Sequence, residues 1–155
     1  MTSPTALPAT SMPGAIPTMN GTGFMLEALD EYARDFIRFS AGASGEVLDI
    51  GCAYGVATIA ALDAGARVCA CDMEPKHLEL VRDRTPPALR ERLRTVPGTL
   101  PDVQFPPLSF DAILASRVLH FLEGIDVART LASMHAWLRP GGQLYVVADT
   151  PYMPQ

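Results

Sequence analysis

The stretch "VLDIGCAYG", residues 47–55, decides the fold because it joins a short strand to a glycine turn. "VLDI" is short and mostly apolar, as a buried strand is. Gly51 and Gly55 follow it, and glycine adopts backbone conformations that other residues resist. A helix that starts directly after such a turn offers backbone amides to a ligand. We therefore expect a strand, a ligand-holding turn and a helix in succession.

Segments typical of strands and of helices alternate on both sides of this stretch. We expect helices at about 23–39, 54–64, from Glu74 and Pro75 onward, at 88–93, and around Val127, Leu131, Met134 and Leu138. We expect strands at 46–50, 67–72, 93–98, 110–116 and 143–149. This alternation predicts an α/β fold, a Rossmann-like doubly wound sheet that is mostly parallel, with helices on both faces. Such sheets bind ligands at the carboxyl ends of their strands, near the point where the strand order reverses.

The length and composition fit one globular domain behind an uncharged arm. The chain has 155 residues, 48% of them hydrophobic, and a formal net charge of -5. Nucleic acid is not an expected partner, because phosphate binding needs a concentrated basic face. No apolar run reaches the roughly 18 residues of a membrane span. The first 26 residues carry no charge and are interrupted by prolines. We expect a flexible Pro/Thr-rich arm at 1–22 and the folded domain at 23–155.

The three cysteines, Cys52, Cys69 and Cys71, are too few and odd in number for a disulfide framework. Cys69 and Cys71 lie two apart on an expected strand, so both point to one face. Zinc needs further ligands at a suitable spacing and none is close, so we expect no metal site. Buried reduced cysteines favour a cytoplasmic location.

Two aspartates distinguish among the ligands that the glycine turn can hold. The dinucleotide pattern G-x-G-x-x-G fails at Ala53 and Val56, and the lysine of a P-loop is missing. Asp49 stands two residues before Gly51, where a carboxylate repels phosphate but suits a cationic ligand. Asp72 ends the next strand, where a carboxylate can accept both ribose hydroxyls of a nucleoside. Either aspartate alone is also typical of a turn or a helix cap. Their joint spacing favours a nucleoside that carries a positive centre.

Five motifs in order resemble those of class I S-adenosylmethionine-dependent methyltransferases. They are "VLDIGCAYG", "CDMEP", "VPGTLPD", "FDAILASRVLHFL" and "LRPGGQLYVV", and they span about residues 46–149. The resemblance implies S-adenosyl-L-methionine as the cofactor, with the turn at its methionine part, Asp72 at its ribose and Met73 at its adenine. The cofactor contacts that it implies are Asp49, Gly51, Cys52, Ala53, Gly55, Asp72, Met73, Thr99, Leu100 and Ser116.

Two positions depart from the family pattern. Ala53 stands where many relatives have glycine, so the backbone there must be within reach of alanine. Thr99 stands where many relatives have an acid bonded to the adenine amino group. Either the hydroxyl of Thr99 or the carboxylate of Asp102 can replace that acid.

The chemistry that the resemblance implies is an in-line displacement, in which the protein mainly positions its reactants. A general base is needed only if the acceptor must lose a proton. His120, after the fourth strand, is the candidate catalytic base, and a structural histidine is the other interpretation. His77, on a helix expected to face solvent, and His135 are expected to be surface or satisfied residues. The segment "NGTGF" is expected to form either a lid or the start of an apolar helix docked on the sheet.

Members of this family usually continue past the fifth strand with a helix and two more strands. We therefore expect a truncated chain that lacks the C-terminal hairpin, a homodimer through the open sheet edge, or a short form with altered function. The leading interpretation is methyl transfer to a small-molecule acceptor, with no membrane partner. The alternative is an S-adenosylmethionine-binding or interaction module without turnover.

Overall fold

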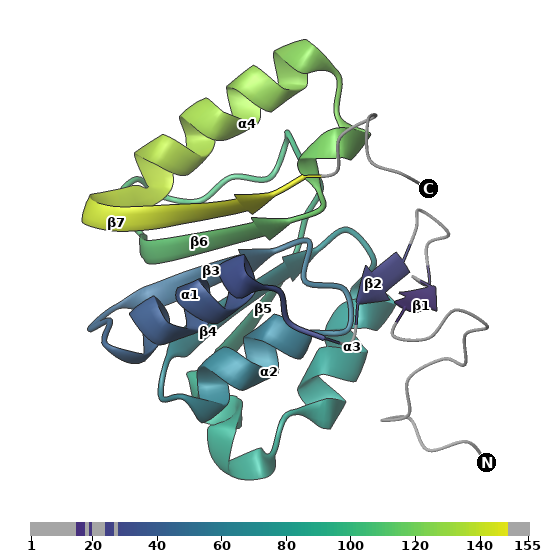
Figure 1. Ribbon diagram of the computed structural model, residues 1–155, viewed down its shortest axis with the longest axis vertical. Coiled ribbons are helices and arrows are strands. Elements are labelled where there is room, and N and C mark those ends of the chain that lie inside the picture. The colour runs from purple at the N-terminus through teal and green to yellow at the C-terminus, as the bar shows by residue number, and fades with distance from the viewer. Residues whose placement is uncertain (1–14, 18, 20–23, 27, 149–155) are drawn as a thin grey trace.

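Five parallel strands form the central sheet of the computed structural model, which describes residues 15–17, 19, 24–26 and 28–148. The strands are β3 (Glu46–Ile50), β4 (Arg67–Asp72), β5 (Leu93–Pro97), β6 (Phe110–Ser116) and β7 (Leu138–Val147). Their order across the sheet is β5-β4-β3-β6-β7 (Figure 1). The chain runs outward from β3 through β4 to β5 and then crosses back to β6, so the strand order reverses between β3 and β6. The predicted Rossmann-like α/β fold is confirmed.

Helices cover both faces of this sheet (Figure 1). The α-helices are α1 (Glu31–Ala41), α2 (Val56–Asp63), α3 (Pro75–Arg84) and α4 (Gly124–Trp137), and the short 3₁₀ helices are η1 (Pro87–Arg92) and η2 (Leu119–Phe121). Side chains of α1, α2 and α3 pack into one core cluster, which includes Val47 of β3. Met134 and Trp137 of α4 pack into the other cluster, with Leu48 of β3. Neighbouring residues of β3 thus face opposite sides, as a two-sided buried strand requires.

The buried cysteines follow the same alternation. Cys69 and Cys71 both belong to the cluster under α4, which confirms that they share one face. Cys52 lies in the cluster under α1 and α2. All three thiols are free and buried.

The first helix begins later than its apolar spacing predicts. Residues 24–26 form strand β2 (Phe24–Leu26), which pairs antiparallel with β1 (Ala15–Pro17), and α1 starts only at Glu31. The expectation of a helix from residue 23 is wrong, because residues 24 and 26 fit a period of two as well as a helical stripe. The Asp30 carboxylate accepts a hydrogen bond from the Ala33 backbone at 2.8 Å and so sets the start of α1. The described residues leave out 20–23, which form most of "NGTGF", and they leave out most of the expected arm.

Two further boundaries differ from those expected. Helix α2 starts at Val56, because Gly55 caps it in a left-handed conformation with φ of 76°. Strand β7 starts at Leu138, not at residue 143 as expected, and so includes "RPGG". A register shift in the pairing with β6 and a φ of 82° at Gly141 accommodate these residues. The buried stripe of α4 is Thr130, Met134 and Trp137, and Leu131 is 39% exposed.

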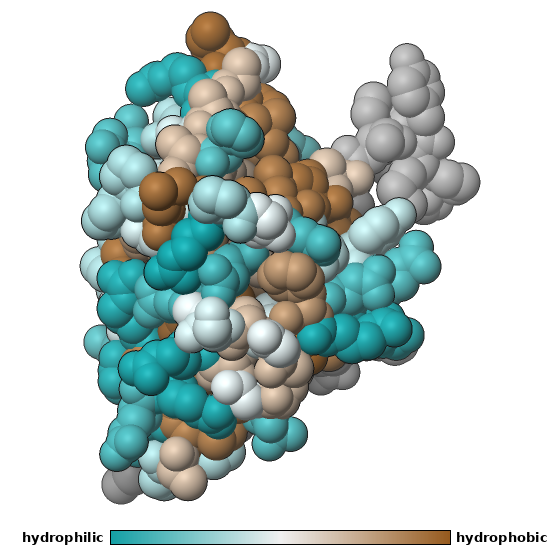
Figure 2. All heavy atoms as spheres, turned by 90° about the vertical axis from the view of Figure 1, so that its left-hand side faces the viewer, coloured by the Kyte–Doolittle hydropathy of each residue, from teal (hydrophilic) through white to brown (hydrophobic). Residues whose placement is uncertain are grey.

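The face at the amino-terminal ends of the strands is seen in Figure 2. Hydrophobic residues gather in its upper half, at the height of α4, β6 and β7, and hydrophilic residues are spread over much of the rest. Strand β7 is the outer strand at this end of the sheet and pairs only with β6 among the described residues. Within the same described ranges, no helix combines the length and the apolar character needed to cross a bilayer.

The Asp30 cap can be tested separately from its ion pair with Arg117, in which the charged atoms lie 3.4 Å apart. Asp30→Ala should lower the free energy of unfolding by about 1 kcal/mol in urea denaturation, because the first turn of α1 loses its side-chain acceptor. Asp30→Asn keeps an acceptor and removes the charge, so it should lose less than half as much. Equal losses in the two variants would show that the ion pair, not the cap, is the stabilising contact.

Candidate functional site

The residues expected to contact a ligand lie along one edge of the sheet, at the carboxyl ends of four adjacent strands. The strand ends are level, because Ile50 of β3 pairs with Cys71 of β4 and with Ala115 of β6. Along this edge the order is Thr99 and Leu100 after β5, Asp72 and Met73 at β4, the glycine turn after β3, and Ser116 at the end of β6. Four strands span roughly 14 Å at the usual spacing, so the edge can hold an elongated ligand.

The glycine turn depends on left-handed backbone conformations. Gly51, Ala53 and Gly55 have φ of 72°, 46° and 76°. A side chain on Gly51 would overlap Val118, which follows β6, and one on Gly55 would approach Val81 of α3 to 2.6 Å. Ala53 adopts the conformation that glycine adopts most easily, at the position where alanine departs from the family pattern. The turn can therefore pack closely against α3 and the loop after β6 only with glycine at both of its ends.

Several amides of the turn are used within the fold. Gly51 and Cys52 donate to the carbonyl of Cys71 at 2.8 and 3.0 Å, and Gly55 donates to the carbonyl of Cys52 at 2.9 Å. Cys52 is buried, and its thiol lies 3.7 Å from the Ala53 carbonyl. Burial raises the pKa of this thiol, and the carboxylates of Asp49 and Asp72 raise it further. The contribution of Cys52 to the site is therefore its backbone and its packing.

Asp49 is buried beneath the turn, on the side of α2. It is 4% exposed, and its Oδ2 accepts a hydrogen bond from the Thr58 hydroxyl at 2.7 Å. Burial raises the pKa of this carboxyl to about 6, against the lowering effect of the Thr58 bond, and the nearby Asp72 adds a smaller rise. Near neutral pH the protein thus holds a poorly solvated negative charge directly under the turn.

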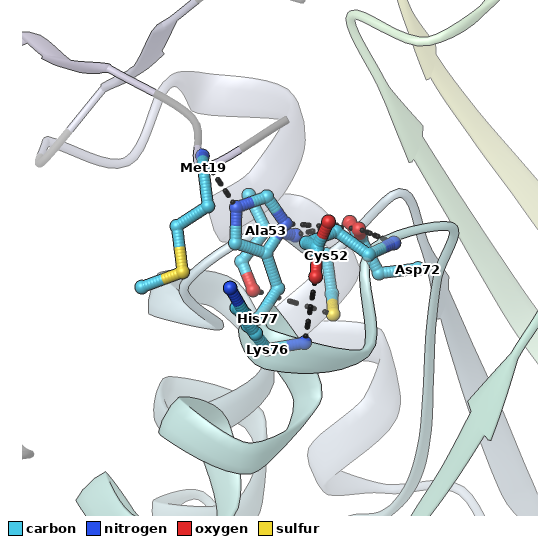
Figure 3. A network of polar contacts seen from close by, with 7 residues as sticks. Met19, Cys52, Ala53, Asp72, Lys76 and His77 are labelled. Atoms are coloured by element: carbon cyan, nitrogen blue, oxygen red, sulfur yellow. Dashed lines mark hydrogen bonds and ion pairs between the residues drawn. The ribbon is translucent and has the colours of Figure 1, made fainter. Parts of the chain in front are cut away.

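Asp72 lies at the centre of a polar network at the end of β4 (Figure 3). Its Oδ2 accepts from the Ala53 amide at 2.9 Å. Its Oδ1 accepts from the Glu74 amide at 2.9 Å and lies 2.9 Å from Nδ1 of His77. A carboxylate has about four acceptor positions, so three donors leave one position on Oδ2 for a ligand.

His77 is a member of this network and does not face solvent. It is 1% exposed, and its ring packs edge-on against the buried ring of Tyr54, with 4.9 Å between the centroids. The expectation of a solvent-facing position is wrong, but the alternative of a satisfied histidine is confirmed, because both ring nitrogens have hydrogen-bond partners. Pro75 is the first residue of α3, so His77 is the third, and side chains at this place reach back toward the preceding loop.

The end of this row that is formed by the residues after β4 and β5 is more exposed. Met73 is 53% exposed after β4. Thr99 and Asp102 are both exposed in the loop after β5, and the Asp102 amide donates to the Thr99 carbonyl at 2.9 Å. Leu100 packs against the core cluster under α4. The structure places both Thr99 and Asp102 at this end of the site.

The opposite end of the edge is formed by the loop after β6. Ser116 is half-buried at the end of the strand, and Arg117 has φ of 55° and pairs with Asp30. His120 is exposed in η2, and its ring centroid lies 4.2 Å from that of Phe121. The predicted base thus lies on the loop that follows β6, beyond Ser116.

Residue patterns alone did not find Thr58, Val118, Met19 or the role of His77. Thr58 and Val118 come close to the turn through helix and loop packing, which no spacing in the sequence records. Met19 lies 58 residues from His77, and its amide donates to His77 Nε2 at 2.9 Å. A sequence signal was available only for His77, as a polar residue in the first turn of a helix that directly follows Asp72.

Comparisons with known proteins agree with this geometry. A family model described as a methyltransferase domain matches residues 48–146, more than half of the chain. The chain belongs to this family. The prediction of a class I S-adenosylmethionine-dependent methyltransferase is thereby confirmed for this methyltransferase domain.

Its relatives include enzymes with quite different acceptors. Demethylmenaquinone methyltransferase of Tropheryma whipplei is 36% identical over 109 residues, 67% of this chain and 41% of that protein. Magnesium-protoporphyrin O-methyltransferase of Rhodobacter capsulatus is 33% identical over 89 residues, 57% of this chain and 38% of that protein. The chain therefore spans about two fifths of the length of these curated relatives.

Solved structures that superpose on this chain are also methyltransferases. The glycopeptide N-methyltransferase MtfA superposes with a TM-score of 0.64 at 28% identity, over 72% of this chain and 50% of that one. That enzyme has also been crystallised with S-adenosyl-L-methionine, with S-adenosyl-L-homocysteine and with sinefungin. A Burkholderia thailandensis 1,6-didemethyltoxoflavin-N1-methyltransferase has a TM-score of 0.61 at 28% identity, over 75% of this chain and 51% of that one.

The buried charge of Asp49 should make the stability of the methyltransferase domain depend on pH. Between the unfolded pKa of 3.8 and the folded pKa of about 6, the folded state holds a proton that the unfolded state has lost. The contribution of Asp49 to stability therefore falls as pH rises through this window. Asp49→Asn keeps an acceptor for Thr58 and removes the charge. It should raise the free energy of unfolding at pH 7.5 by up to about 3 kcal/mol.

Urea denaturation of both proteins from pH 7.5 to pH 4 measures this effect. The advantage of the variant should shrink as the pH falls through 6. Asp63→Asn, on the exposed end of α2, is the matched control and should differ little from the parent at any pH. A constant difference between Asp49→Asn and the parent over the whole range would contradict a titrating Asp49.

Proposed function

We propose that this methyltransferase domain binds S-adenosyl-L-methionine along the carboxyl edge of its sheet and transfers the methyl group to a small-molecule acceptor. The observation that carries the proposal is the order of side chains along this edge. Apolar and polar groups after β5 and β4 come first, then the carboxylate of Asp72, then the glycine turn over Asp49, then Ser116. Adenine, ribose and the methionine part follow one another in the same order along the cofactor, and the transferable methyl group branches from the sulfur that joins the ribose to the methionine chain.

The residues present fit each part of this ligand. The free position on Oδ2 of Asp72 accepts a ribose hydroxyl, and the exposed Met73 covers the adenine. Thr99, or Asp102, bonds the adenine amino group, and Leu100 borders the ring. The left-handed turn at Gly51 lets the methionine part approach the backbone. Asp49 supplies negative charge beneath the turn, which favours the cationic end of the cofactor and disfavours phosphate.

The domain acts mainly by positioning. When bound, the cofactor supplies an electrophilic methyl group on a positive sulfur. The glycine turn and Asp72 hold the sulfur-bearing part of the ligand against the carboxyl ends of the strands. The buried surroundings of Asp49 and Cys52 keep water from this part of the ligand. Ser116 and Arg117 border the place where an acceptor must approach.

His120 takes the proton of acceptors that must lose one. It lies on the loop after β6 and is exposed, so an acceptor can reach its imidazole. For an acceptor with a free lone pair, such as a neutral amine, no base is needed. Relatives named above are methyltransferases of demethylmenaquinone, magnesium-protoporphyrin, a glycopeptide and 1,6-didemethyltoxoflavin, which is consistent with a fold that leaves acceptor choice to surrounding segments.

A second copy of the chain is the proposed partner of β7. This ten-residue strand offers backbone hydrogen-bonding groups along its outer edge, and its side chains are only half-buried. Two copies can pair these edges about a two-fold axis. A net charge of -5 does not suit nucleic acid, and three free buried cysteines suit the reducing cytoplasm.

Titration calorimetry tests the cofactor assignment. S-adenosyl-L-methionine and S-adenosyl-L-homocysteine should bind, and NAD should not. Asp72→Asn should weaken the affinity for S-adenosyl-L-homocysteine at least about tenfold, because a charge-assisted hydrogen bond to ribose is lost. Asp63→Asn is the matched control and should bind as the parent does. Failure of the parent to bind either adenosyl ligand would contradict the proposal, and binding without methyl transfer to any acceptor in a broad screen would favour a binding module.

His120→Gln tests the base. Its affinity for S-adenosyl-L-homocysteine should stay within about twofold of the parent, because His120 lies beyond the cofactor end of the edge. With an acceptor that must lose a proton, turnover should fall roughly 10²-fold or more. His135→Gln, an exposed histidine of α4, should leave turnover unchanged. Equal turnover in both variants with such an acceptor would exclude His120 as the base.

A further inference from the structure

We propose that His77 is a positioning residue for the Asp72 carboxylate and that it couples cofactor binding to the N-terminal segment through Met19. The proposal rests on the assignment of Asp72 to the ribose. Its basis is one chain of contacts, from the Met19 amide through the His77 ring to Asp72 (Figure 3).

The two contacts of the ring determine its tautomer. Nε2 of His77 accepts the Met19 N–H at 2.9 Å, so Nε2 carries no proton. The ring proton is therefore on Nδ1, which donates to Oδ1 of Asp72 at 2.9 Å. The ring is 1% exposed and packs against Tyr54, so these two contacts are those that its nitrogens make in this buried position. His77 is thus a neutral imidazole with a fixed direction of donation.

This donation limits how the carboxylate can rotate. Oδ1 receives both the Glu74 amide and His77, whereas Oδ2 receives only the Ala53 amide. Rotation about the Cβ–Cγ bond of Asp72 would break all three hydrogen bonds. The two backbone donors hold the carboxylate to its own loop and to the turn, and His77 is the side chain that completes the set. Its role is therefore to keep the remaining acceptor position on Oδ2.

The hydrogen bond from Met19 connects His77, and through it the Asp72 carboxylate, to the segment that contains β1 and β2. Met19 is itself 44% exposed, and it lies between the two strands of this hairpin. A hydrogen bond from its amide is possible only while His77 keeps the Nδ1–H tautomer that serves Asp72. While His77 bridges the two contacts, cofactor binding should therefore increase the protection of the Met19 amide, because coupling between two sites is reciprocal.

Three substitutions separate the two contacts. The amide of Asn lies as far from Cβ as Nδ1 does, so His77→Asn keeps the donor to Asp72 and loses the acceptor for Met19. The amide of Gln lies as far from Cβ as Nε2 does, so His77→Gln keeps the acceptor for Met19 and loses the donor to Asp72. His77→Phe keeps the ring volume and loses both. Thermal unfolding monitored by circular dichroism establishes that each variant is folded.

Two measurements follow these variants. Calorimetry with S-adenosyl-L-homocysteine should give near-parent affinity for His77→Asn and a loss of about tenfold for His77→Gln and His77→Phe. Hydrogen exchange of the Met19 amide should become faster in His77→Asn and His77→Phe and stay slow in His77→Gln. In the parent, adding S-adenosyl-L-homocysteine should slow this exchange further. Three folded variants that all bind as the parent does would overturn the positioning role.

A measurement on the parent chain keeps the proposal testable if the variants do not fold. Long-range ¹H–¹⁵N correlation spectra of the imidazoles should show His77 with its proton on Nδ1 and a bare Nε2. An Nε2–H tautomer or an imidazolium at neutral pH would overturn the proposal. If the parent fails to bind the adenosyl ligand, the proposed function fails, whatever the tautomer. If the parent binds, Asp72→Asn binds at least about tenfold more weakly, and the His77 variants match the parent, then only the role of His77 fails.

Discussion

The carboxylate of Asp72 joins three segments of the chain at the carboxyl edge of the sheet. Its donors are the Ala53 amide in the glycine turn, the Glu74 amide before α3, and the His77 ring in the first turn of α3. A buried carboxylate is costly unless hydrogen bonds compensate for the loss of water, so these donors must stay in place together. The shape of the turn, the start of α3 and the open acceptor position that we propose for a ribose therefore depend on one another.

Asp49 and Asp72 are both buried at this edge, but they are stabilised to very different degrees. Asp49 accepts hydrogen bonds from the hydroxyl and the backbone of Thr58, and burial raises its pKa to about 6. Asp72 has three donors and keeps one acceptor position open. This difference fits two roles: the charge of Asp49 attracts a positive group at a distance, and Asp72 makes direct hydrogen bonds to the ligand. An incompletely compensated charge costs stability, and costs of this kind are common where a site must attract a ligand of opposite charge.

The elements that were predicted well have strong local signals. Strands β3, β4 and β6 are short buried runs between clear turn residues, and Pro75 marks the start of α3 because proline suits a first helical turn. The errors occur where two patterns fit the same letters. Residues 24–26 satisfy both a helical stripe and a strand, and "RPGG" resembles a break although a register shift lets β7 include it. In both cases pairing with a neighbouring strand, which is a non-local contact, selected the structure.

The sequence by itself determined the succession of the five sheet strands and the four α-helices along the chain, the glycine turn after β3, and the two aspartates on which the proposed cofactor site rests. These features depend on local conformational preferences and on the side-chain period of a strand, which neighbouring residues specify. Only the tertiary structure decided that His77 is buried, that it bonds Asp72 on one side and Met19 on the other, and that Val118 closes over Gly51. These contacts join residues far apart in the chain, and their existence depends on how α3, the loop after β6 and the N-terminal hairpin pack around the end of the sheet.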